Sequence, residues 1–106
     1  MQKVGIVGAG FMGKMHGSVY KGLESAELVG VFDFVRERAV PYAEQFGIKV
    51  FDTLEDLAKE CTVVDICTPT YTHSDLAIAG AKLGLHVVCE KPMARTLEQA
   101  KAMIKA

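Results

Sequence analysis

The sequence has no strong excess of charge of either sign and no long apolar run. Its 106 residues carry 12 lysines and arginines against 13 aspartates and glutamates, which are interspersed along the chain. A nucleic-acid-binding surface needs clustered basic side chains, and a membrane-spanning helix needs roughly 18 or more consecutive apolar residues. The first residues also lack the basic and apolar regions of a secretory signal. We therefore expect a cytoplasmic protein with no nucleic-acid partner and no membrane partner.

Tryptophan is absent, and cysteine and histidine are scarce. The cysteines and histidines are Cys61, Cys67, Cys89, His16, His73 and His86. None of them forms the closely spaced pairs that are typical of zinc and redox sites, so we expect buried free thiols and no metal site. A chain of this length can form one self-supporting core without disulfides or metals. Residues 1–106 are expected to be a single domain.

Short apolar, β-rich runs alternate with segments of helical period along the whole chain. The expected strands cover residues 3–7, 27–32, 49–51, 62–67 and 85–89. Most of these runs lack polar alternation, as is typical of strands covered by helices on both faces. The pattern predicts an α/β fold with a Rossmann-type, doubly wound parallel sheet of about five strands and helices on both faces. Met12, Met15, Val19 and Leu23 recur at helical spacing, and we expect this stripe to face the sheet.

A glycine-rich segment follows the first expected strand and opens the first expected helix. It reads Gly8-Ala9-Gly10-Phe11-Met12-Gly13, a G-x-G-x-x-G spacing. In this pattern the first glycine permits a tight turn, the second lets the backbone approach a pyrophosphate, and the third lets the helix pack closely on the strand. The helix N-terminus then presents free amides to the phosphates. The segment therefore predicts a dinucleotide site.

Asp33 follows the second expected strand, twenty-five residues after Gly8. A carboxylate at this place accepts hydrogen bonds from the adenosine ribose hydroxyls of NAD, and its charge repels the 2′-phosphate of NADP. Arg36 and Arg38 lie close by and pair well with phosphate, so NAD is the expected cofactor and NADP stays open. The same skeleton also serves S-adenosylmethionine-dependent methyltransferases, and other residues must discriminate between the two classes.

Two later segments make that discrimination. Thr68-Pro69-Thr70-Tyr71-Thr72-His73 follows the fourth expected strand, and Glu90-Lys91-Pro92 follows the fifth. Together with the glycine segment and Asp33, and over the whole chain, they resemble the glucose-fructose oxidoreductase, inositol dehydrogenase and MocA family of NAD(P)-dependent oxidoreductases. The resemblance implies hydride transfer between NAD(P) and a sugar, polyol or related hydroxy compound.

The resemblance also implies which residues surround the cofactor. They are Gly8, Gly10, Phe11, Met12, Gly13, Asp33, Thr68, Pro69, His73, Glu90 and Lys91. Asp33 would hold the adenosine ribose, whereas Glu90 and Lys91 would lie near the nicotinamide ribose. Lys91 would also reach the substrate hydroxyl as the catalytic residue, because a cation beside the carbon–oxygen bond stabilises the negative charge that develops on oxygen.

Members of this family carry a second, substrate-binding domain that has no counterpart in these residues. The chain ends where a sixth strand would begin, so we expect the last strand of the sheet to be missing and the chain alone to show little turnover. An exposed sheet edge favours self-association, so we expect either a homo-oligomer formed through this edge or a rearrangement of the last helix. The alternative interpretation is a non-catalytic nucleotide-binding or self-associating structural fragment.

Overall fold

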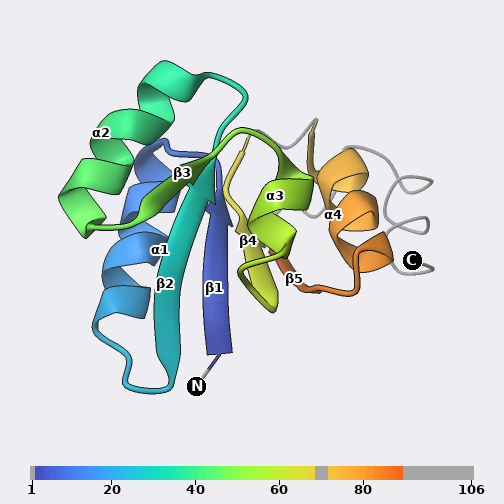
Figure 1. Cartoon of the computed structure of the whole chain (residues 1–106), viewed down its shortest axis with the longest axis horizontal. Coiled ribbons are helices and arrows are strands. Elements are labelled where there is room, and N and C mark those ends of the chain that lie inside the picture. Colours follow the sequence, from blue (N-terminus) through green and yellow to red (C-terminus); the bar gives the residue numbers. More distant parts are fainter. Residues whose placement is uncertain (1, 69–71, 90–106) are drawn as a thin grey trace.

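The computed structural model describes residues 2–68 and 72–89, which form a parallel sheet flanked by helices (Figure 1). The strands are β1 (Gln2–Val7), β2 (Ala26–Phe32), β3 (Lys49–Phe51), β4 (Val63–Ile66) and β5 (His86–Cys89). The helices are α1 (Phe11–Lys21), α2 (Arg36–Phe46), α3 (Leu54–Ala58) and α4 (His73–Lys82). The expected α/β fold is confirmed, and each expected strand boundary lies within one residue of the observed one.

The strand order is β3-β2-β1-β4-β5, and every neighbouring pair is parallel. The chain therefore runs outward from β1 to β3, returns across the sheet to β4, and continues outward to β5. Such a reversal leaves a crevice outside the carboxyl ends of β1 and β4, where open α/β sheets bind their ligands. The topology alone thus places the candidate site next to Gly8 and Thr68, which follow these two strands.

The two faces of the sheet are buried by different helix pairs. Alternate residues of β1 and β2, such as Val4, Ile6 and Val31, pack in one buried cluster with Ala39 and Phe46 of α2. The other face forms a second cluster, whose buried members include Val7, Phe32, Leu57, Val64, Ile66 and Leu76. Because strand side chains alternate between faces, both faces being buried explains the continuous apolar runs in the sequence.

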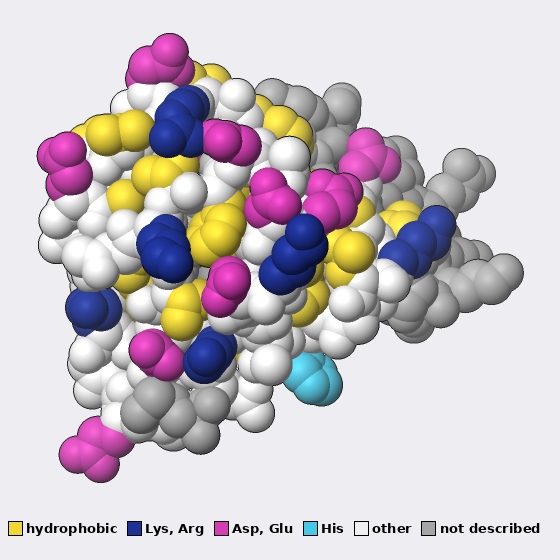
Figure 2. Space-filling view, viewed as in Figure 1, with side chains coloured by type: hydrophobic (Ala, Val, Ile, Leu, Met, Phe, Trp, Pro, Cys, Tyr) yellow, Lys and Arg dark blue, Asp and Glu magenta, His cyan; other side chains and the backbone are white. Residues whose placement is uncertain are grey.

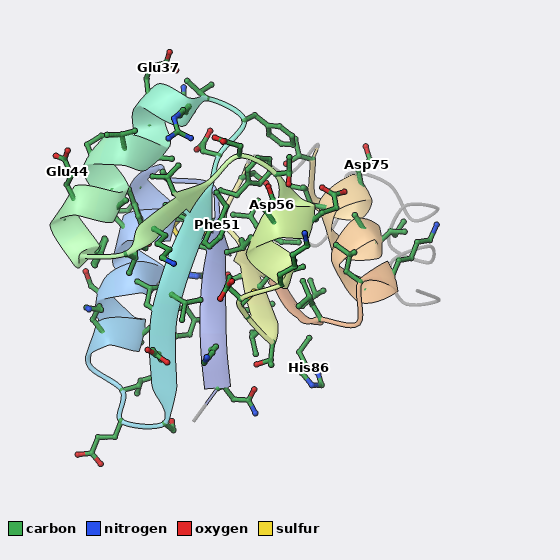
Figure 3. The ribbon with its side chains drawn as sticks, in the orientation of Figure 1. Glu37, Glu44, Phe51, Asp56, Asp75 and His86 are labelled. Carbon is green, nitrogen blue, oxygen red and sulfur yellow. The ribbon has the colours of Figure 1, made fainter. Side chains whose placement is uncertain are left out.

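Helix α2 separates its buried and exposed sides clearly. Ala39, Tyr42 and Phe46 are buried against the sheet, whereas Glu37 and Glu44 reach away from it (Figure 3). The helix ends at Gly47, whose φ of 67° suits the left-handed closing residue of a helix.

Helix α1 does not present its apolar stripe to the sheet, and the sequence-based expectation for it was wrong. Met15, Val19 and Leu23 are exposed, at 45%, 57% and 45%. The buried residues of α1 are Gly13 and Gly17. A Cβ on Gly17 would lie 2.2 Å from the hydroxyl of Tyr42, so only glycine permits this close approach. The requirement for glycine at the contact therefore sets the rotation of α1, and the apolar stripe turns outward.

Charged side chains of both signs are mixed over the face shown in the space-filling view (Figure 2). Among residues 2–68 and 72–89, no helix has the length and apolar character needed to cross a membrane.

Candidate functional site

The candidate site is a hollow of about 520 Å³ at the carboxyl ends of β1, β2 and β4. It is lined by Gly8, Gly10, Phe11, Met12, Asp33, Phe34, Val35, Arg38, Cys67, Thr68 and Thr72. These residues come from the glycine turn, from the loop that follows β2 with the start of α2, and from the loop that follows β4. The hollow lies at the topological switch point, where the fold predicts a ligand.

The glycine turn is shaped by two close backbone approaches. Gly8 has a φ of 104°, a conformation that residues with a side chain rarely adopt. A Cβ on Gly13 would lie 2.0 Å from the carbonyl oxygen of Gly8, so α1 starts in direct contact with the turn. Tyr42 of α2 donates its hydroxyl hydrogen to the Gly13 carbonyl at 2.6 Å. These contacts fix the direction in which the N-terminus of α1 points.

The amides in the first turn of α1 have no acceptor within the helix. Phe11 and Met12 lie in this turn and line the hollow. The amides and the positive end of the helix dipole make such a turn a favourable place for an anion.

Asp33 joins the glycine turn to the loop that follows β2. Its Oδ2 accepts a hydrogen bond from the Ala9 amide, and its Oδ1 accepts one from the Val35 amide, both at 2.8 Å. A carboxylate oxygen has two lone pairs, so each oxygen can accept a further hydrogen bond. Asp33 is half-buried and lines the hollow, where its remaining acceptor capacity is available to a ligand hydroxyl.

The two arginines that follow Asp33 differ in position. Arg36 pairs with Asp52 on the exposed surface and does not line the hollow. Arg38 lies two residues further along, on the other side of the first turn of α2, and does line it. Only Arg38 therefore has the position expected of a guanidinium that approaches the ribose end of a dinucleotide.

The loop after β4 closes the other side of the hollow. Thr72 donates its hydroxyl hydrogen to the Thr68 hydroxyl at 2.6 Å. Cys67 donates its amide hydrogen to the Val7 carbonyl at 2.7 Å, which continues the pairing of β1 and β4 up to the hollow.

The structure gathers six of the residues named from the sequence around one hollow: Gly8, Gly10, Phe11, Met12, Asp33 and Thr68. Gly13 lies behind the turn as a packing residue and does not line the hollow. His73 begins α4, and Pro69, Glu90 and Lys91 lie outside the described residues. Sequence reasoning did not name the lining residues Phe34, Val35, Cys67 and Thr72.

A buried polar cluster behind the hollow was also missed. Asp65 of β4 is 0% exposed, and its Oδ2 lies 2.6 Å from Nδ1 of His16. Tyr20 donates its hydroxyl hydrogen to the same oxygen at 2.7 Å. Burial, and then the hydrogen bond to Asp65, raise the pKa of Tyr20. An aspartate inside the apolar run Val63–Ile66 was the available signal, because a buried carboxylate requires donors.

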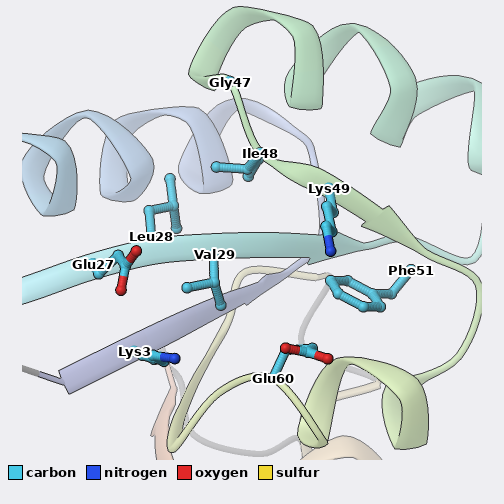
Figure 4. A pocket seen from close by; sticks show the side chains of 9 residues that line it. All are labelled: Lys3, Glu27, Leu28, Val29, Gly47, Ile48, Lys49, Phe51 and Glu60. Carbon is cyan, nitrogen blue, oxygen red and sulfur yellow. The ribbon is translucent and has the colours of Figure 1, made fainter.

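A second hollow, of about 410 Å³, lies at the amino ends of the strands (Figure 4). Lys3, Glu27, Lys49 and Glu60 surround Val29 and Phe51 there. It is lined by Gly47 at the C-terminal end of α2, none of its lining residues belongs to the first turn of a described helix, and it lies at the opposite end of the sheet from the switch point. The hollow beside Asp33 is therefore the candidate site.

Comparisons with known proteins find relatives along almost the whole chain. Residues 2–106 match the model of an oxidoreductase family described by its NAD-binding Rossmann fold. The chain is 35% identical over 103 residues to glucose-6-phosphate 3-dehydrogenase of Bacillus subtilis. This match covers 97% of this chain and 29% of that protein. It is 36% identical over 105 residues to inositol 2-dehydrogenase of Rhizobium meliloti, which covers 97% of this chain and 32% of that protein.

A solved structure with a bound cofactor is similarly close. The WlbA dehydrogenase from Bordetella pertussis, in complex with NADH and UDP-GlcNAcA, superposes with a TM-score of 0.92 at 33% identity. The match covers 98% of this chain and 31% of that one. The chain thus spans about a third of the length of these relatives.

Proposed function

Because the chain belongs to the oxidoreductase family with an NAD-binding Rossmann fold, we propose that it is the cofactor domain of an enzyme that oxidises or reduces a sugar, polyol or related hydroxy compound. The substrate class is supported by relatives named for glucose-6-phosphate and inositol. The observation that carries the proposal is the hollow in which the glycine turn, the start of α1 and Asp33 meet. Residues 1–106 act as one domain in this proposal.

The hollow fits a dinucleotide in shape and in charge. A Cβ on Gly10 would meet nothing within 4 Å, so the backbone is open on this side to a pyrophosphate. The amides of Phe11 and Met12 would hold the phosphates, and Asp33 would accept from the adenosine ribose. Gly8 and Gly13 allow α1 to start in direct contact with the turn. Thr68 would flank the dinucleotide. When bound, NAD supplies the nicotinamide carbon that accepts or donates hydride.

Lys91 is proposed as the catalytic residue, with Glu90 beside it near the nicotinamide ribose and with Pro69 and His73 along the dinucleotide. An ammonium group close to the reacting carbon–oxygen bond would stabilise charge on oxygen while hydride moves. Support for these roles comes from their position in the sequence after β4 and β5, because ligands of this fold bind outside the carboxyl ends of the strands.

NAD is proposed as the preferred cofactor and NADP as a weaker one. Asp33 would repel a 2′-phosphate, whereas Arg38 in the same hollow would attract it. Because Arg36 is engaged with Asp52, only Arg38 is placed to offset the carboxylate. A cytoplasmic location belongs to the same proposal and is supported by the buried free thiol of Cys61.

Calorimetric titration with NAD⁺, NADP⁺ and S-adenosylmethionine tests the cofactor class. We expect NAD⁺ to bind more tightly than NADP⁺ and S-adenosylmethionine to give no heat of binding. Binding of S-adenosylmethionine in preference to both dinucleotides would contradict the proposal.

A self-associating module is the second candidate function, and the exposed side of α1 favours it. Met15, Val19 and Leu23 leave an apolar stripe in solvent, and Val88 of the outer strand β5 is 43% exposed. We propose that this side and the edge of β5 bind a second copy of the chain.

A further inference from the structure

Asp65 is a buried carboxylate that the cofactor site does not use directly. It lies near the middle of the sheet on the face covered by α1, between the buried residues Val64 and Ile66. Burial of an ionised carboxylate costs free energy unless hydrogen-bond donors surround it. His16 and Tyr20 approach Oδ2 at 2.6 and 2.7 Å, and Sγ of Cys67 lies 3.5 Å from Oδ1.

The glycines of α1 explain how these donors reach the carboxylate. A Cβ on Gly13 would contact Gly8 and Ile6, so this glycine brings α1 close to the glycine turn and β1. A Cβ on Gly17 would contact Tyr42 and Phe46, so that glycine brings α1 close to α2. His16 and Tyr20 are four residues apart, so they project from one side of the helix, and both contact β4. The close approach therefore makes Asp65 the point at which side chains of α1 and β4 bond to each other.

Donor atoms of His16, Asp65 and Cys67 all lie within 4.8 Å of one another, which is also the make-up of a zinc site. The distance between Nδ1 of His16 and Oδ2 of Asp65 shows whether these atoms are spaced for a shared metal ion or for a hydrogen bond. Nitrogen and oxygen ligands of tetrahedral zinc lie about 3.3 Å apart or more, because each is roughly 2.0–2.2 Å from the ion. The 2.6 Å between Nδ1 and Oδ2 is shorter and is a charge-assisted hydrogen bond. Since a carboxylate only accepts, Nδ1 carries the hydrogen.

This bond lies close to residues that line the hollow. His16 is four residues after Met12, about one helical turn away, and Asp65 of β4 is two residues before Cys67. Met12 and Cys67 both line the hollow. Nδ1 of His16 is also 3.5 Å from Sγ of Cys67. The bond thus joins the helix whose N-terminus faces the phosphates to the strand whose end carries Cys67 and Thr68.

We propose that His16 and Asp65 are positioning residues for the dinucleotide, a role that presupposes cofactor binding as proposed above. Their hydrogen bond fixes the distance between the start of α1 and the end of β4. That distance sets the spacing between the Phe11 and Met12 amides and Thr68. Neither residue touches the cofactor. Asp33 and Arg38, which are proposed to meet the adenosine ribose, line the hollow from the end of β2 and the start of α2.

Two substitutions of His16 separate the bond from general stability. The amide nitrogen of asparagine takes the place of Nδ1, so His16→Asn keeps a donor to Asp65, whereas the longer His16→Gln moves its amide away. We expect His16→Gln to weaken NADH binding about tenfold and His16→Asn to stay within about threefold of the unmodified chain. Affinity for adenosine, which carries no phosphate, is expected to be unchanged in both variants.

Ser18→Ala is the matched control, because Ser18 makes an exposed hydrogen bond to the Lys14 carbonyl on the same helix. It should leave both affinities unchanged. Asp65→Asn should reproduce the His16→Gln result if the variant folds, and circular dichroism checks folding for every variant.

The results that overturn this role are distinct from a failure of cofactor binding. If the unmodified chain binds NADH and His16→Gln binds it equally well, the positioning role is wrong. A parallel loss of NADH and adenosine affinity would reveal a general structural role instead. A thiolate-to-cobalt absorption band on titration with Co²⁺, lost in Cys67→Ser, would identify a metal site and overturn the assignment of the bond.

Discussion

Asp33 accepts a hydrogen bond from the Ala9 amide at 2.8 Å, which connects the residue expected to read the ribose with the turn expected to hold the phosphates. The two residues are 24 positions apart and lie at the ends of neighbouring strands. The carboxylate therefore has a structural task in the free protein in addition to its proposed task in the complex. Loss of Asp33 should affect both the turn and the choice of cofactor.

Asp33→Ala is expected to weaken NADH binding at least about tenfold, because charge-assisted hydrogen bonds to the ribose hydroxyls are lost. NADPH should lose less affinity, since removal of the carboxylate also removes its repulsion of the 2′-phosphate. Fluorescence titration with each cofactor measures the two changes. Equal losses for NADH and NADPH would remove Asp33 from the ribose-reading role.

Gly10→Ala and Gly13→Ala form a matched pair within the glycine turn. A Cβ on Gly13 would lie 2.0 Å from a backbone oxygen. Gly13→Ala is therefore expected to lower the free energy of unfolding by about 2–3 kcal/mol and to abolish NADH binding. At Gly10 a Cβ has open space, and Gly10→Ala should unfold like the unmodified chain while losing affinity for NADH.

Thermal unfolding and NADH titration on both glycine variants check this difference. Unchanged NADH affinity in a folded Gly10→Ala variant would mean that no ligand group approaches the backbone there. Unchanged stability of Gly13→Ala would contradict the close approach of α1 to the turn.

Tyr42 and Tyr20 predict that the free energy of unfolding falls at alkaline pH. Burial is the largest cause that raises the pKa of Tyr42 and of Tyr20 above the ordinary value of about 10. In the unfolded chain these phenols ionise first, so their contribution to the free energy of unfolding is complete below pH 10 and declines as the pH rises further. Urea unfolding between pH 8 and about pH 11 measures the decline.

Tyr42→Phe isolates one of the two phenols. It leaves the Gly13 carbonyl without its 2.6 Å donor, so stability at neutral pH should fall by about 1–3 kcal/mol. The alkaline decline should become shallower in this variant. An identical decline with and without the Tyr42 hydroxyl would show that this phenol does not ionise differently in the folded chain.

Self-association is expected through the exposed side of α1 and the edge of β5. Val19 is 57% exposed at the centre of the stripe, and Val19→Glu should raise the monomer fraction in sedimentation velocity at high protein concentration. Gln45→Glu adds the same charge on the exposed side of α2 and is the control. A single monomeric species for the unmodified chain at every concentration would count against this interface.

The sequence predicted those parts of the fold that depend on local pattern. The apolar runs located all five strands, and the glycine spacing with Asp33 located most of the hollow, because the topology of a parallel sheet brings the ends of β1, β2 and β4 together. Helix α1 was oriented wrongly, since the period of Met15 and Val19 carries no information about a contact that only glycine permits.

The pair of His16 and Asp65 was missed for a different reason. The two residues are 49 positions apart, and hydrophobic periodicity does not register polar partners. Their pairing could have been found only by searching for the hydrogen-bond donors that a carboxylate within an apolar strand requires.

Titration of the chain with NADH, followed by the fluorescence of the ligand, tests the central claim most directly, because the glycine turn, the start of α1 and Asp33 all lie within the described residues. Saturable binding that NAD⁺ competes away, and that Asp33→Ala weakens, is the predicted result. A folded chain, with its helix and strand signals intact, that shows no saturable change would contradict the account.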